Sequence, residues 1–118
     1  MSARFSRLQR LTQSRDFDRL FRSSERSSDD LVTVLARRSG LTQARLGMAI
    51  SRKCAPRAVD RNRLKRVIRE SFRQAGELLG GLDLVVIGRR GKRPIKSGLL
   101  VKSLDKHWMV VSERCKRC

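Results

Sequence analysis

The chain has 118 residues, of which 29 are lysine or arginine and 11 are aspartate or glutamate, so its formal net charge is +18. This length allows one compact domain but not two, and 39% of hydrophobic residues is enough for one modest core, which argues against a wholly disordered basic tail. A run of about 18 apolar residues is absent, which excludes a membrane span, and residues 1–10 lack the apolar segment of a secretory signal. An anionic membrane surface could neutralise the charge, but nucleic acid is favoured because the apolar residues of the most basic segment are needed for a core.

Residues 1–13 are basic and polar, and we expect residues 1–7 to form a flexible tail. Residues 14–22 predict a short helix with Asp16 in its first turn, where a negative charge interacts favourably with the helix dipole. Phe17 and Phe21 fall on one face of that helix. Either both aromatic side chains belong to the core, or one or both line a groove in which RNA bases stack.

Residues 23–30 predict a polar linker, in which Asp29 and Asp30 indicate a turn more readily than a metal site. Residues 31–38 are rich in β-branched side chains and predict a strand. Residues 45–51 alternate apolar and polar side chains, and we expect them to form its antiparallel partner.

The most informative segment is residues 57–73, which predicts a long helix. Pro56 suits the first position of that helix, and Gly80 and Gly81 are a natural stop for it. One face of this helix is apolar, through Leu64, Val67, Ile68, Phe72 and Ala75. The remaining positions are almost all cationic, and such a helix repels itself unless a polyanion neutralises it. We therefore expect the helix to face RNA.

Residues 83–88 form a continuous apolar run, which predicts a strand buried on both faces. Residues 89–93 form a basic loop that either cradles phosphate or is a plain solvated turn. Residues 94–111 predict a final helix, and we expect residues 113–118 to form a flexible basic tail. The apolar stripe of the final helix comprises Leu100, Val101, Leu104, Trp108 and Val111.

The order of elements predicts an α+β fold, a single-domain α/β sandwich with a mostly antiparallel sheet packed with helices. In the final helix, Trp108 is expected to anchor the core, and His107 to be a surface or half-buried bystander. The odd number of cysteines, three, argues against a disulfide framework and favours a reducing compartment, which we expect to be the cytoplasm. Cys115 and Cys118 have zinc-like spacing, but a single pair is a weak signal.

The residues predict no catalytic group and no metal ligand set in the protein. The acidic residues are scattered and mostly alternate with arginine, whereas two-metal hydrolysis needs carboxylates gathered around the ions. On the residues alone the protein binds RNA and does not cut it. The alternatives are a general structural RNA-binding protein, such as a ribosomal one, and a nuclease that acts alone.

The sequence R-N-R-L-K-R-V-I-R-E-S-F-R at residues 61–73 closely resembles the signature helix of the bacterial ribonuclease P protein component. Other blocks of that family agree in order along positions 8–111. They are Leu11 with Asp16, Phe17 and Phe21; Arg45, Leu46 and Gly47 with Ser51, Arg52 and Lys53; residues 83–87; and Leu104 with Trp108.

The resemblance implies an α/β sandwich in which the signature helix follows a left-handed βαβ crossover. It also implies that the protein joins one large catalytic RNA, and that the two together remove the 5′ leader of precursor tRNA. The RNA would perform the hydrolysis, with Mg²⁺ at the RNA active site rather than in a protein metal site. No obligatory protein partner is implied.

The resemblance also implies the residues that contact RNA, namely Arg61, Asn62, Arg63, Lys65, Arg66 and Arg69, with Arg52 and Lys53 before them. Arginine can pair with phosphates bidentately. A cleft between helix and sheet would hold the leader, and Phe17 and Phe21 are assigned to it. The structural alternative is that Arg63 or Arg73 pairs with Glu70 or Asp60 and that Asn62 holds a helix end.

Overall fold

A computed structural model describes residue 10, residues 14–91 and residues 95–116. Within these residues the helices are α1 (Ser14–Arg22), α2 (Ala58–Gln74) and α3 (Ser97–Lys116). The strands are β1 (Glu25–Ser28), β2 (Val32–Arg38), β3 (Arg45–Ala49) and β4 (Leu82–Gly88). None of the helices described is both long and apolar enough to cross a lipid bilayer.

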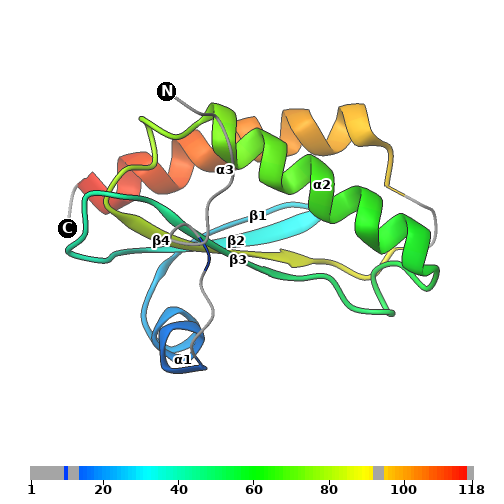
Figure 1. Ribbon diagram of the computed structural model, residues 1–118, viewed down its shortest axis with the longest axis horizontal. Coiled ribbons are helices and arrows are strands. Elements are labelled where there is room, and N and C mark those ends of the chain that lie inside the picture. The colour runs from blue at the N-terminus through cyan, green and yellow to red at the C-terminus, as the bar shows by residue number, and fades with distance from the viewer. Residues whose placement is uncertain (1–9, 11–13, 92–94, 117–118) are drawn as a thin grey trace.

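The strands form one mixed sheet in the order β1-β2-β4-β3. β2 is antiparallel to both β1 and β4, whereas β3 is parallel to β4. α2 and α3 lie on one face of the sheet, and the short α1 lies against the other (Figure 1). The predicted α+β sandwich is thereby confirmed.

The expected antiparallel pairing of residues 31–38 with residues 45–51 is wrong, because β4 lies between β2 and β3. The predicted burial of β4 on both faces is confirmed, since residues 82–86 are all buried. A strand of this kind is most stable at the centre of a sheet, where both faces are covered. A parallel neighbour needs a long crossover connection, and α2 provides it between β3 and β4. The left-handed sense of this crossover stays a prediction.

The segment expected to be a linker contains the edge strand β1. Its sequence, Glu-Arg-Ser-Ser, contains no hydrophobic residue, so periodicity could not reveal it. Pairing with the apolar β2 holds this segment in an extended conformation.

The long helix is shorter than expected at both ends. Arg57 is its N-cap in an extended conformation, with φ −86° and ψ 132°, so Pro56 precedes the helix instead of opening it. The helix ends with Ala75 as its C-cap. The chain then turns so that Leu79 is fully buried, and Gly81 adopts a positive φ of 82° just before β4 begins.

The apolar face of α2 packs against α3. Phe72 and Trp108 meet edge to face, with ring centroids 6.4 Å apart and an interplanar angle of 71°. The indole N–H of Trp108 donates to the Ser71 hydroxyl at 2.9 Å, which satisfies a polar group in the core. The prediction that Trp108 anchors the core is therefore confirmed. The prediction that Val101 belongs to the apolar stripe is wrong, because its side chain is 40% exposed.

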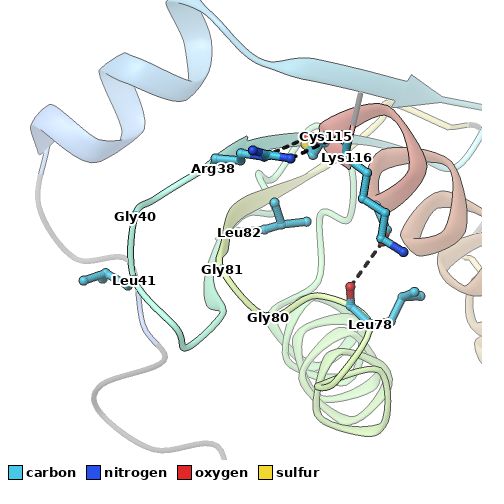
Figure 2. A pocket seen from close by; sticks show the side chains of 10 residues that line it. Arg38, Gly40, Leu41, Leu78, Gly80, Gly81, Leu82, Cys115 and Lys116 are labelled. Atoms are coloured by element: carbon cyan, nitrogen blue, oxygen red, sulfur yellow. Dashed lines mark hydrogen bonds between the residues drawn. The ribbon is translucent and has the colours of Figure 1, made fainter. Parts of the chain in front are cut away.

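Residues 113–116 are not the flexible tail that we expected, because α3 continues through Lys116 and Cys115 is only 3% exposed. Arg38 holds this helix end by donating from Nε to the Cys115 carbonyl and from Nη2 to the Lys116 carbonyl (Figure 2). A pocket of about 440 Å³ lies beside it, lined in part by Leu41 and Leu78. Residues 1–7, 117 and 118 lie outside the described residues. The zinc-like spacing of Cys115 and Cys118 is therefore not tested.

His107 is not a bystander, since its side chain is buried and connects α3 to the start of the sheet. Its Nδ1 lies 2.6 Å from the Ser27 hydroxyl, and its Nε2 lies 3.1 Å from Oδ2 of Asp29 in an electrostatic contact. Asp29 also accepts the backbone N–H groups of Leu31 at 2.8 Å and Val32 at 3.0 Å. The predicted turn before β2 is thus confirmed.

The charge of Asp29 should stabilise the fold in a pH-dependent way. Burial by itself raises the pKa of Asp29, but hydrogen bonds from Ser103, Val32 and Leu31, with His107 nearby, lower it overall. A folded-state pKa below the unfolded value gives a stabilisation that is complete above about pH 4 and is lost as the pH falls through the folded pKa. We expect Asp29→Asn to lower the free energy of unfolding by about 1 kcal/mol at neutral pH, with allowance for solvent screening.

Urea denaturation at a series of pH values measures this effect. The gap between Asp29→Asn and the wild type should narrow as the pH falls below about 4, and should close once the pH is below the lowered folded-state pKa of Asp29. Asp30→Asn is the matched control, because Asp30 is the exposed neighbour. A gap of the same size at every pH would contradict the electrostatic explanation.

Candidate nucleic-acid interface

One strip of the sheet is left uncovered on the face that carries α1. The register aligns four residues across all four strands. Each of them is exposed or half-buried, and we call the row Ser28, Thr33, Ile87 and Ala49 the open strip. In the next row on the same face, Leu35 and Val85 are buried under Leu20 of α1. Within the part of the chain that the structure describes, α1 therefore covers one part of this face and leaves the open strip partly exposed.

The two aromatic side chains of α1 differ in how far they are buried. Leu20, at 1% exposure, is the residue of α1 that enters the core. Phe17 and Ile87 are both half-buried and pack against the same cluster of Leu20, Leu35 and Val85. Phe21 is 56% exposed. The structure thus brings Phe17 near the open strip and leaves the ring of Phe21 accessible to a partner.

Cations flank the open strip. Arg89 follows β4, and its Nη1 donates to the Ser28 hydroxyl at 3.2 Å and to the Asp29 carbonyl at 3.0 Å. On the β3 side, Arg52 and Lys53 are exposed in the turn after the strand. The sequence pointed to a basic loop after β4 but did not single out Arg89, because only the fold brings it to Ser28. Lys92 and Arg93 of that loop lie outside the described residues.

Two of the predicted RNA-binding arginines make contacts within the protein. Nη1 of Arg61 donates to the carbonyls of Ala55 at 2.9 Å and Pro56 at 2.8 Å, just before α2. Arg63 donates to the Ser97 hydroxyl at 2.8 Å and the Ile95 carbonyl at 2.7 Å, at the start of α3.

The structural alternative for the arginines therefore holds in part. Arg63 binds neutral oxygens and not Glu70 or Asp60. Arg73 does pair with Glu70. Both interpretations were open from the sequence, because charge and spacing do not reveal which carbonyls a guanidinium reaches.

The other predicted residues of α2 form a stripe, which we call the cationic stripe: Asn62, Lys65, Arg66 and Arg69. Asn62 and Arg66 are exposed, and Lys65 and Arg69 are half-buried. In the part of the chain that the structure describes, no carboxylate lies within 4 Å of these three cations. Their charge is left for an external anion, such as phosphate.

A buried ion cluster joins α1 to the sheet, and sequence reasoning missed it. Arg45 donates to Asp83 from Nε and Nη2, both at 2.7 Å, and its Nη1 lies 3.6 Å from Oδ2 of Asp16. Hydrogen bonding to Asp83, together with the charges of Asp83 and Asp16, raises the pKa of Arg45, although burial opposes this. The only signal in the sequence was the presence of these residues in separate family blocks.

Among the described residues, no three His, Cys, Asp or Glu side chains gather in a way that could hold a metal ion. Asp16 and Asp83 already face a guanidinium. The chemistry available at this surface is therefore the binding of anions and of flat apolar groups.

Residues 5–111 match the family model described as Ribonuclease P. The chain belongs to the ribonuclease P protein family. The Ribonuclease P protein component of Methylococcus capsulatus is 45% identical over 111 residues, which cover 94% of this chain and 87% of that relative. The Ribonuclease P protein component of Nitrosococcus oceani is also 45% identical over 111 residues, which cover 94% of this chain and 93% of that relative.

Solved structures of ribonuclease P proteins have the same fold. A Staphylococcus aureus RNase P protein mutant, described as defective in mRNA degradation, superimposes with a TM-score of 0.79 at 25% identity and 87% coverage of both chains. The RNase P protein from Thermotoga maritima gives a TM-score of 0.61 at 32% identity and 88% coverage of both chains. The resemblance read from the signature helix is therefore confirmed, and the chain is a protein component of an endoribonuclease, ribonuclease P.

The two groups of arginines in this ribonuclease P protein should respond differently to truncation. Arg63→Ala removes two hydrogen bonds and leaves the Ile95 carbonyl without its donor, so we expect a loss of about 1–3 kcal/mol in the free energy of unfolding. Arg66→Ala removes an exposed side chain, and its effect should stay within about 0.5 kcal/mol. Urea denaturation of both variants measures the difference, and equal stabilities would contradict the structural role of Arg63.

Proposed function

We propose that this chain binds the RNA subunit of ribonuclease P through the cationic stripe, and the 5′ leader of precursor tRNA across the open strip. The observation that carries the proposal is that unpaired cations and an uncovered, aromatic-flanked strip of sheet occur on one small domain. An aromatic groove bordered by cations is the arrangement that binds single-stranded nucleic acid. The family relation supports RNA as the partner.

The cationic stripe suits a structured RNA. Arg66 and Arg69 can each pair with phosphate oxygens, and Asn62 can bond to backbone or base. Arg61 and Arg63 keep their positive charge while they hold the helix, so they add to the field around it. Anchored cations lose little conformational freedom on binding, which favours affinity.

The open strip suits a single strand. It crosses four strands, and three spacings of about 4.8 Å give a length of about 14 Å. At about 3.4 Å per stacked nucleotide, the strip accommodates roughly four nucleotides. Phe17 and Phe21 offer stacking surfaces, while Arg52, Lys53 and Arg89 supply charges for the phosphates.

We further propose that the RNA subunit carries out the hydrolysis and holds the Mg²⁺ that it needs. The protein's part is to neutralise phosphate repulsion, which lowers the Mg²⁺ concentration that assembly and substrate binding require. Such an assembly needs no second protein and works in the cytoplasm, where precursor tRNA is made.

The test is leader removal from a precursor tRNA at low Mg²⁺, with a bacterial ribonuclease P RNA in the presence and absence of the protein, and with the protein alone as control. We expect stimulation that depends on the RNA. Tight binding without stimulation would favour a general structural RNA-binding role. Cleavage by the protein alone would contradict the proposal that the RNA carries the chemistry.

Phe21→Ala tests the open strip with little risk to folding, because Phe21 is 56% exposed. Loss of one stacking surface should weaken the binding of leader-bearing precursor tRNA to the holoenzyme by about 1–3 kcal/mol, and leave the leaderless tRNA unaffected. Leu41→Ala is the control, since Leu41 is 51% exposed beside the pocket at the end of α3. An equal loss with both tRNAs would place Phe21 outside the leader site.

A further inference from the structure

Two residues on the side of α1 that faces the sheet attach the helix to it. Leu20 packs against Leu35 and Val85, and Asp16 pairs with Arg45 at 3.6 Å. With nine residues, α1 is too short to be stable by itself, so its position depends on such tertiary contacts. These two residues lie four positions apart, along the line of the helix that faces the sheet.

The aromatic residues lie on a different line of the same helix. Phe17 and Phe21 each follow an attachment residue by one position, which turns them by about 100° around the helix axis. The rotation of α1 about its axis therefore decides whether these rings face the open strip. Leu20, with Phe17 partly packed beside it, holds the helix against the sheet, but apolar contacts are non-directional and do not by themselves define that rotation.

Arg45 is a rigid partner for Asp16. Its Nε and Nη2 both donate to Asp83, its register partner on β4, so the guanidinium is held in a defined orientation. Asp16 is only 9% exposed, although it is a carboxylate on a short surface helix. A buried carboxylate depends strongly on its cation, because an unpaired buried charge is costly.

We infer that Asp16 is a positioning residue, whose ion pair with Arg45 sets the rotation of α1 and so directs Phe17 and Phe21 at the leader. The inference rests on the proposed function of the open strip. Asp16 does not touch the leader itself, and its effect is transmitted through the two rings.

The test measures the affinity of reconstituted holoenzyme for two substrates, a precursor tRNA with its leader and the same tRNA without it. Asp16→Asn is compared with Asp18→Asn, which removes the same charge from an exposed position of the same helix. We expect Asp16→Asn to weaken binding of the leader-bearing substrate about 3- to 10-fold and to leave the leaderless one unchanged. Asp18→Asn should weaken neither, since the loss of a negative charge does not oppose RNA binding.

A combined variant with three substitutions separates positioning from general destabilisation. If Asp16 acts through the aromatic rings, Asp16→Asn should cost less in a Phe17→Ala, Phe21→Ala background than in the wild type, because the two effects are not additive. A merely structural role would lower the affinity for both substrates and would add to the loss of the rings.

The outcomes distinguish the inference from the proposed function. If removing the rings weakens leader binding but Asp16→Asn behaves like Asp18→Asn, the positioning role is wrong and the leader site stands. If removing the rings has no effect on leader binding, the leader site is wrong and the inference falls with it. Should Asp16→Asn fail to assemble with the RNA, Arg45→Lys replaces it, because one ammonium can pair with Asp83 but cannot reproduce the fork that reaches both acids. Unchanged leader binding by that variant would overturn the inference.

Discussion

The burial of β4 on both faces is the constraint on which the rest of the structure depends. A strand that is apolar on both sides must have a covering layer above and below it and a neighbour on each edge. β2 and β3 provide the edges, α2 and α3 provide one layer, and Leu20 of α1 provides part of the other. Because β3 runs parallel to β4, the connection between them has to cross the sheet, and that connection is α2.

The crossover explains how so basic a helix can belong to a small folded domain. The core includes Leu64, Ile68 and Phe72 of α2. Because these residues fix one side of the helix against the core, the opposite side faces solvent. Arg61 and Arg63 tie the start of the helix to the segments before α2 and before α3 through backbone carbonyls. The self-repulsion of the helix is thus offset partly by packing and partly by hydrogen bonds, and the cationic stripe remains for an anionic partner.

The two faces of the sheet differ in how much of them is covered by helices. The face under α2 and α3 carries the main core cluster of the domain. Among the described residues, the face under α1 is covered where Leu20 and Phe17 pack and where Asp16 and Arg45 meet, and the open strip lies beside that cover. A small helix attached in this way next to an uncovered strip can shape a binding surface without closing it. The same weak attachment makes the surface sensitive to a single ion pair.

Much of this protein could be predicted from its sequence. The periodicity of residues 57–73, the apolar run of β4 and the position of Trp108 identified the core, and the signature helix identified the family, because these are local patterns. Strand order was decided only by the tertiary structure, since β2 and β3 look like a hairpin until β4 is inserted between them. The same holds for β1, which has no hydrophobic signal, for the buried His107, and for the ion cluster of Arg45 with Asp16 and Asp83. Each of these depends on contacts between residues distant in sequence, and side-chain type and spacing along the chain do not encode which distant groups will meet.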